Sequence, residues 1–207
     1  MLPVKPARKT LTDILRSVFR KLLNRSASIL DRVGVTPNMI TIFGLIGTGA
    51  AAFLVYRGYL LAAAVTAAAS AAMDAFDGSL ARYQGVKGPF GAFLDSTIDR
   101  YGEGLLLMGV GLYFLENQKP AMILVAGAAI LGSMLVSYTR ARGEAVGYTV
   151  KCGIFTRVER AIVLILSLAA GYPEVGVGLV AVFANLTAIQ RILAVVRQEK
   201  IRSGEME

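Results

Sequence analysis

The sequence contains no histidine and a single cysteine, Cys152. Without a second cysteine, the chain cannot form an internal disulfide. Without histidine, an enzyme of this sequence would use a carboxylate as its general base and would hold a metal through oxygen atoms. Oxygen ligands favour hard cations such as Mg²⁺ or Mn²⁺ over zinc. The N-terminus also lacks an apolar run of the signal-peptide type, so nothing predicts its cleavage.

Acidic residues are few relative to basic ones, whereas apolar residues are abundant. The 207 residues are 55% hydrophobic, and 22 Lys and Arg against 14 Asp and Glu give a net charge of +8. A mean hydropathy of +0.59 is too high for a soluble protein of this size. The composition predicts a membrane protein whose basic loops lie against anionic lipid head groups, with no nucleic-acid partner.

Six apolar segments are long enough, or nearly so, to cross about 30 Å of hydrocarbon. They cover residues 38–56, 60–82, 91–115, 120–142, 157–171 and 175–197. Before them, residues 11–33 combine an apolar stripe with basic residues, which predicts an amphipathic helix in the membrane interface. The expected fold is all-α: an integral membrane bundle of six transmembrane helices with an N-terminal amphipathic juxtamembrane helix.

The basic residues predict the orientation of this bundle. With six spans, most lysines and arginines fall on one side, and only Arg57 and Lys119 fall in loops on the other. By the positive-inside rule, both termini are cytoplasmic and the protein is a multi-pass protein of the plasma membrane.

Four aspartates stand where the second predicted span ends and the third begins. Asp74 and Asp77 share one helical face, and Asp95 and Asp99 share another. A charged group within an apolar span is costly, so each is a candidate functional residue. The short turn between these spans predicts antiparallel neighbours whose carboxylates face each other near the cytoplasmic end.

Four carboxylates this close would repel one another, and two divalent cations would neutralise them. Paired ions are also a common means of holding a diphosphate while a phosphoryl group moves. Buried salt bridges to Arg82 and Arg100 are an alternative, but two arginines cannot neutralise four aspartates. A membrane cation transporter is another alternative, although its carboxylates would be spread along a pathway.

The pattern Asp74-x2-Asp77-Gly78-x2-Ala81-Arg82-x8-Gly91-x3-Asp95-x3-Asp99 resembles the signature of the CDP-alcohol phosphotransferase family at every fixed position. The resemblance extends over residues 30–200. It implies a six-helix membrane fold, usually a homodimer, with a site open to the cytoplasm and reachable from the bilayer. Residues 36–200 would form this domain, between an N-terminal cytoplasmic segment (1–35) and a C-terminal tail (201–207).

The resemblance also implies roles for individual residues. Asp74, Asp77, Asp95 and Asp99 would bind two Mg²⁺ or Mn²⁺ ions, with Asp74 and Asp95 shared between the ions and Asp99 as the general base. The residues implied to contact the CDP-lipid are Thr36, Pro37, Asn38, Met39, Gly78, Arg82 and Gly88. The Thr-Pro pair among them also suits an ordinary helix start, and both interpretations can hold together.

Arginines in the second half of the chain bear on the acceptor. A guanidinium binds two phosphate oxygens at once, so several arginines near the site favour a phosphorylated acceptor over free serine or choline. Their pattern resembles the inositol-phosphate-using members of the family. The residues that would bind inositol phosphate are Ser137, Arg140, Arg142, Arg160 and Arg191. Lipid anchoring is the alternative for Arg140 and Arg142, and it suffices to explain Arg157.

The sequence therefore predicts a transferase of phospholipid biosynthesis. It would move the phosphatidyl (or archaetidyl) group of CDP-diacylglycerol or CDP-archaeol to the hydroxyl of inositol phosphate and release CMP. Glycerol 3-phosphate is the alternative acceptor. The sequence leaves open the lipid type, the metal used in the cell, and the role of Glu103, one turn past Asp99.

Overall fold

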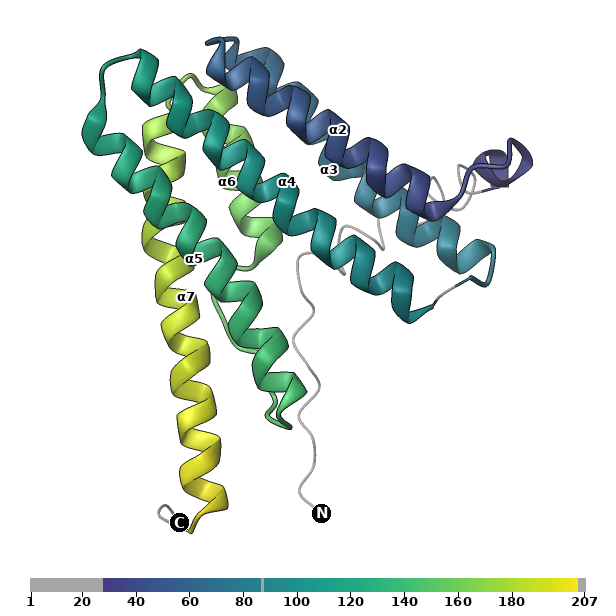
Figure 1. Cartoon of the computed structure of the whole chain (residues 1–207), viewed down its shortest axis with the longest axis vertical. Helices are drawn as coiled ribbons and strands as arrows, with labels where there is room; N and C mark the ends of the chain where they lie inside the picture. The colour runs from purple at the N-terminus through teal and green to yellow at the C-terminus, as the bar shows by residue number, and fades with distance from the viewer. Residues whose placement is uncertain (1–27, 87, 205–207) are drawn as a thin grey trace.

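The computed structural model describes residues 28–86 and 88–204. Within these ranges the chain is helical and has no strand, which confirms the all-α class. Six helices alternate in direction (Figure 1): α2 (Pro37–Tyr56), α3 (Leu60–Tyr83), α4 (Pro89–Glu116), α5 (Pro120–Ala145), α6 (Arg157–Ala169) and α7 (Pro173–Arg202). One helix falls on each of the six apolar segments of the sequence.

Four of the described helices, α2, α3, α5 and α7, are long and apolar enough to cross a membrane. α4 has 28 residues, but charged residues interrupt its first half. α6 has only 13 residues, about 20 Å of helix, which is less than the hydrocarbon thickness. The count of six spans therefore stays a prediction. The amphipathic helix predicted at 11–33 lies outside the described residues, except for a helical stretch at 28–32.

Proline and capping residues determine where the helices begin. α2, α4, α5 and α7 each start at a proline, whose missing N–H is not needed in a first turn. Thr36 caps α2 by accepting a hydrogen bond from the Met39 N–H at 3.4 Å. At α6, the Glu159 carboxylate accepts a hydrogen bond from the Thr156 N–H at 2.9 Å, as in a capping box. This cap places Arg157 in the first turn of α6.

The helices pack as two groups, which are connected by the packing of α4 against α5 and by α6. α2 packs against both α3 and α4, α5 packs against α7, and α6 contacts α3 and α7. Within the described residues, α3 and α4 are not among the pairs that pack extensively. The expectation that they are close antiparallel neighbours is therefore wrong. They share α2 as a common partner, and side chains from α6 reach the space between them.

The contact between α2 and α4 is close because a glycine permits it. A Cβ at Gly109 would lie 2.5 Å from the carbonyl oxygen of Ala52 on α2. Such backbone proximity is typical of small residues at helix interfaces in membranes. Fully buried Val55, Val110 and Phe114 extend this interface. The interface fixes the position of α4, and hence of Asp99, relative to α2.

Candidate active site

Asp77 is the most buried of the four aspartates and points from α3 towards α2. Its Oδ2 accepts a hydrogen bond from the Thr41 hydroxyl at 2.8 Å. The same hydroxyl lies 3.1 Å from the Pro37 carbonyl oxygen, in the first turn of α2. Asp77 also interacts electrostatically with Asp74 and Asp95. Acidic residues from α3 and α4 therefore share one region, as the sequence predicts.

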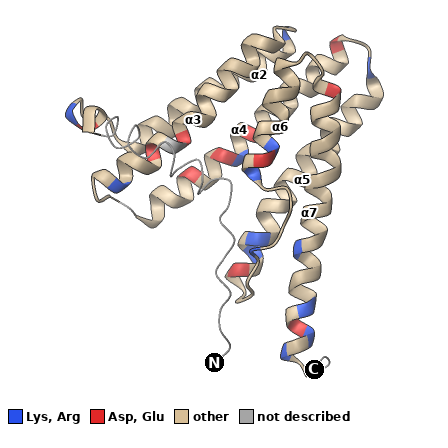
Figure 2. Cartoon of the chain, turned by 180° about the vertical axis from the view of Figure 1, so that it is seen from behind, with Lys and Arg blue, Asp and Glu red and all other residues tan. Residues whose placement is uncertain are grey.

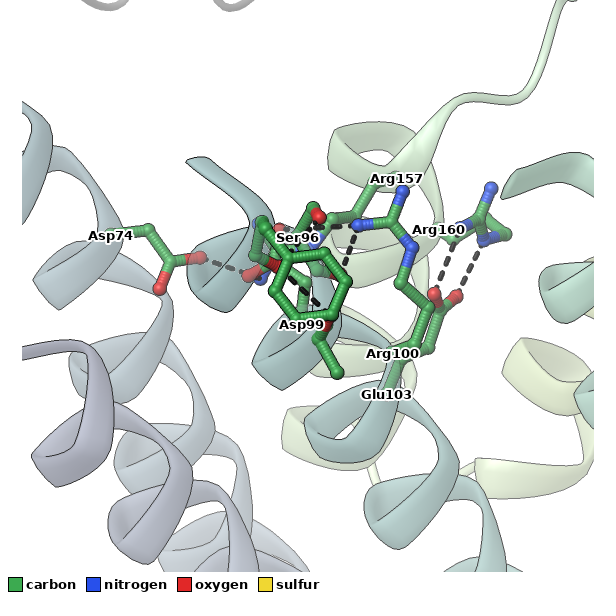
Figure 3. Close-up of polar contacts among 9 residues, drawn as sticks. Asp74, Ser96, Asp99, Arg100, Glu103, Arg157 and Arg160 are labelled. Carbon is green, nitrogen blue, oxygen red and sulfur yellow. Dashed lines mark hydrogen bonds and ion pairs between the residues drawn. The ribbon is translucent and has the colours of Figure 1, made fainter. Parts of the chain in front are cut away.

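Arg157, at the start of α6, reaches between α3 and α4 (Figure 3). Its Nη2 lies 2.5 Å from Asp74 Oδ2 and 2.7 Å from Asp99 Oδ1. One cationic nitrogen thus bridges carboxylates from two helices. The other oxygen of Asp99 lies 4.0 Å from Arg100 Nη1. The assignment of Arg157 to lipid anchoring is therefore corrected, because its guanidinium binds two of the predicted metal ligands.

The present side-chain positions explain why the four carboxylates do not form one cage. Among the residues that the structure describes, no three acidic or cysteine side chains converge so as to hold a metal ion. Asp77 is turned towards Thr41, and Arg157 lies between Asp74 and Asp99. The donor set nevertheless fits Mg²⁺ or Mn²⁺, because it consists of carboxylate oxygens and two of them already approach one positive centre. Asp99 also interacts electrostatically with Asp74 and Asp95.

Glu103 is paired with Arg160 on α6. Arg160 Nε and Nη2 donate to the two Glu103 oxygens at 2.5 and 2.8 Å, and its Nη1 donates to the Phe155 carbonyl at 3.2 Å. Arg160 is only 2% exposed, so the fork is buried between α4 and α6. The structure thus supplies the role of Glu103 that the sequence leaves open: it anchors the start of α6. The binding of an acceptor phosphate by Arg160 stays a prediction.

Arg191 is also buried, and two backbone carbonyls engage it. Its Nε donates to the Cys152 carbonyl at 3.0 Å, and its Nη1 donates to the Val136 carbonyl on α5. Arg191 interacts electrostatically with Arg140 and Arg160. Three of the arginines predicted to bind the acceptor therefore lie near one another, where Arg140 is paired with Glu144 and Arg160 with Glu103.

Residues 147–156 form the loop between α5 and α6. Hydrogen bonds hold this loop against α7. The Tyr148 hydroxyl donates to Glu199 Oε2 at 2.5 Å, and this hydrogen bond raises the pKa of Tyr148. The Thr149 N–H donates to Gln198 Oε1 at 3.0 Å. The Phe155 N–H donates to the Thr187 hydroxyl at 3.2 Å. These contacts hold the segment that leads into α6 and its two arginines.

The remaining predicted acceptor residues lie near the end of α5. Arg140 and Arg142 are exposed, and Ser137 is half-buried one turn earlier. Arg140 Nε donates to Glu144 Oε1 at 3.1 Å. Both arginines are thus exposed at this end of α5, and Arg140 is paired with Glu144.

The predicted nucleotide-contacting residues lie at helix ends beside the aspartates. Thr36, Pro37, Asn38 and Met39 form the start of α2, and Gly88 precedes α4. A Cβ at Gly91 would lie 4.0 Å from Asn38 Oδ1, so the starts of α2 and α4 adjoin. Towards the end of α3, Arg82 Nη2 donates to Ser79 Oγ at 2.8 Å. A Cβ at Gly78 would lie 3.6 Å from Arg82 Nη1, so this glycine leaves space beside the arginine.

The sequence pattern that defines CDP-alcohol phosphatidyltransferases matches residues 34–196. The chain belongs to this family. An archaetidylinositol phosphate synthase of Pyrococcus horikoshii is 36% identical over 179 residues, which are 86% of this chain and 93% of that protein. The crystal structure of the Mycobacterium tuberculosis phosphatidylinositol phosphate synthase with CDP-DAG bound has a TM-score of 0.80 and 30% identity, and the match covers 84% of this chain and 94% of that one.

Membership of the CDP-alcohol phosphatidyltransferase family confirms the resemblance drawn from the aspartate motif. The chain is a membrane transferase of phospholipid biosynthesis. A second structure of the Mycobacterium tuberculosis enzyme, in complex with manganese and citrate, has a TM-score of 0.79, 30% identity and coverage of 84% of this chain and 88% of that one. The manganese of that relative agrees with the use of a divalent metal predicted from the carboxylates.

Proposed function

We propose that this protein transfers the phosphatidyl or archaetidyl group of a CDP-lipid to the hydroxyl of inositol phosphate and releases CMP. One observation carries the proposal: Asp74 of α3 and Asp99 of α4, two fixed positions of the family motif, contact the same cationic nitrogen of Arg157. The relatives named above are an archaetidylinositol phosphate synthase and a phosphatidylinositol phosphate synthase, which supports the choice of acceptor.

The aspartates are the metal ligands of this proposal. Asp74, Asp77, Asp95 and Asp99 would hold two Mg²⁺ or Mn²⁺ ions. When bound, such ions neutralise the diphosphate and the departing CMP. The residues at the helix ends, from Thr36 to Met39 with Gly78, Arg82 and Gly88, hold the CDP group against these carboxylates.

Asp99 is the general base. It accepts the proton of the acceptor hydroxyl, and the hydroxyl oxygen forms a bond to the phosphorus on the lipid side. The bond from that phosphorus to the oxygen it shares with CMP breaks, and CMP leaves with the electron pair. Arg100 and Arg157 lie beside Asp99 and add positive charge where the phosphates would lie.

The acceptor phosphate lies against Ser137, Arg140, Arg142, Arg160 and Arg191. Arg191 lies near enough to Arg140 and Arg160 to interact electrostatically with both, which is consistent with this placement. The exposed Arg140 and Arg142 can form forked hydrogen bonds to a phosphate dianion. Glycerol 3-phosphate carries the same phosphate and is the alternative acceptor.

The protein is proposed to work as a homodimer with six spans, its site and both termini on the cytoplasmic side. The alternating helices support a common side for the two ends of the bundle, because α2 begins and α7 ends towards the same side of the molecule (Figure 1). Figure 2 shows few basic residues at the opposite end, where α2 meets α3 and α4 meets α5.

The reaction is tested by measuring CMP release from a CDP-lipid by the purified protein in detergent with Mg²⁺ or Mn²⁺. We expect Asp99→Asn to lower kcat by about 10²-fold or more, because it removes the proton acceptor. Glu116→Gln is the matched control, since it makes the same carboxylate-to-amide change at the exposed far end of α4. Full activity of Asp99→Asn would reject the assignment.

The acceptor is tested by comparing inositol phosphate with glycerol 3-phosphate in the same assay. We expect turnover with inositol phosphate, and we expect Arg140→Gln to raise its KM about tenfold by removing one forked contact. Arg197→Gln, an exposed arginine near the end of α7, should leave the KM unchanged. Turnover with glycerol 3-phosphate alone would replace the acceptor but keep the reaction class.

A further inference from the structure

Arg157 lies where a cation shared by Asp74 and Asp99 would lie. Its Nη2 is 2.5 Å from Asp74 Oδ2 and 2.7 Å from Asp99 Oδ1, so one positively charged atom contacts ligand oxygens on two helices. We infer that Arg157 competes with the divalent cation for these two carboxylates. Its guanidinium must leave them before a metal ion can bind both. The inference rests on the proposed function only in taking these aspartates as metal ligands.

The competition follows from distances. A Mg²⁺ ion binds carboxylate oxygens at about 2.0–2.1 Å. The two oxygens that Arg157 contacts cannot reach that distance from an ion while a guanidinium nitrogen lies between them. Positive charge on the arginine would also repel the ion. Arg157 therefore opposes metal binding by occupying space and by its charge.

The surroundings of Arg157 fix its backbone but leave its side chain free to move. The Thr156–Glu159 capping box and the buried Arg160–Glu103 fork hold the first turn of α6. The Arg157 side chain is 42% exposed, so its long stem can swing out without disturbing that turn. Glu103 also interacts electrostatically with Arg157.

The exchange has two consequences. Without a divalent ion, Arg157 neutralises carboxylates that would otherwise repel across the space between α3 and α4. With an ion bound, the displaced guanidinium stays at the edge of the site, free to bind an anion. Arg157 thus raises the metal concentration that the site needs and couples metal binding to the release of a phosphate-binding side chain.

The first test measures Mn²⁺ binding to the purified full-length protein in detergent, without any lipid or acceptor. We expect Arg157→Gln to bind Mn²⁺ about fivefold or more tightly than the wild type, because the competing cation is gone. Arg197→Gln removes a surface arginine away from the carboxylates and should leave the affinity unchanged. Unchanged or weaker binding by Arg157→Gln would overturn the inference.

Asp74→Asn separates this inference from the proposed metal site. If it weakens Mn²⁺ binding while Arg157→Gln does not strengthen it, the competition is rejected and the metal site stands. If Asp74→Asn leaves Mn²⁺ binding unchanged, both are rejected.

The wild-type protein offers a second test that needs no variant. An arginine-selective dicarbonyl reagent is applied with and without Mn²⁺, and the modified residues are identified by peptide mass spectrometry. We expect Mn²⁺ to increase modification of Arg157 and to leave the exposed Arg197 unchanged. Equal or slower modification of Arg157 at a saturating Mn²⁺ concentration would contradict its displacement.

Discussion

The contrast between Arg157 and Arg160 shows how two arginines on one turn of α6 perform different tasks. Arg157 is half-exposed and contacts aspartates through one nitrogen. Arg160 is buried and satisfies both oxygens of Glu103 as well as the Phe155 carbonyl. A buried ion pair contributes little net stability, but the loss of one partner leaves an uncompensated charge. The Glu103 pair therefore fixes the position from which Arg157 reaches the site.

We expect Glu103→Gln to destabilise the protein by about 3 kcal/mol, because Arg160 keeps its charge in a buried place without a counter-ion. Thermal unfolding in detergent measures this loss. The double variant Glu103→Leu with Arg160→Met should recover most of the stability, since it removes both charges. CMP release should stay low in the double variant, because Arg160 is also proposed to bind the acceptor phosphate. A Glu103→Gln protein as stable as the wild type would contradict the buried pair.

The aspartates could be found from the sequence, whereas Arg157 could not be placed. Carboxylates in apolar spans are costly, so Asp74 and Asp99 could be recognised from their spacing alone. A basic residue at the start of a span has an ordinary explanation in lipid anchoring, and 58 positions separate Arg157 from Asp99 in the chain. The available signal was the i, i+3 spacing of Arg157 and Arg160, which places both near one face of α6.

At the scale of the helices, the approach of α2 to α4 holds the two halves of the site together. We expect Gly109→Ala to lower the unfolding temperature and CMP release together, because the new Cβ would lie 2.5 Å from the Ala52 carbonyl oxygen. Backbone atoms cannot rotate away, so the helices must separate, which typically costs about 1–3 kcal/mol.

Gly127→Ala is the matched control for this change, because it lies on α5 with no atom within 4 Å of the added Cβ. It should be neutral, or stabilising by up to about 1 kcal/mol through higher helix propensity. Equal effects of the two substitutions would show that helix propensity, and not the contact with α2, decides the outcome at Gly109.

The sequence predicts where each helix begins along the chain better than it predicts which helices pack against one another. Prolines and turn residues mark the starts of α2, α4, α5 and α7, and these signals are local. The separation of α3 from α4 was not predictable from their short connection. It depends on how closely each helix packs against α2. Gly44 on α2 permits close contact with α3, and Gly109 on α4 permits close contact with α2. Such complementarity depends on three-dimensional shape, which the hydrophobic pattern does not contain.

At the scale of the whole molecule, the single native cysteine can report the orientation in the membrane. Cys152 is exposed in the loop between α5 and α6, which carries the chain into the site. The proposed orientation places this loop in the cytoplasm, because most of the basic residues lie on its side of the bundle (Figure 2). An impermeant maleimide should therefore label Cys152 in inverted membrane vesicles and spare it in right-side-out vesicles.

A relocated cysteine provides the opposite signal. In a Cys152→Ser protein, Asn117→Cys places the thiol in the exposed turn between α4 and α5, next to Lys119. This turn carries little positive charge, and the Lys119 ammonium there is paired with Glu174 at the start of α7, which raises the pKa of Lys119. We expect labelling of this variant only in right-side-out vesicles. Labelling of both cysteines from one side would mean that α5 does not cross the membrane. If each cysteine were instead labelled from the side opposite to that expected, the carboxylates and the reaction would lie outside the cytoplasm.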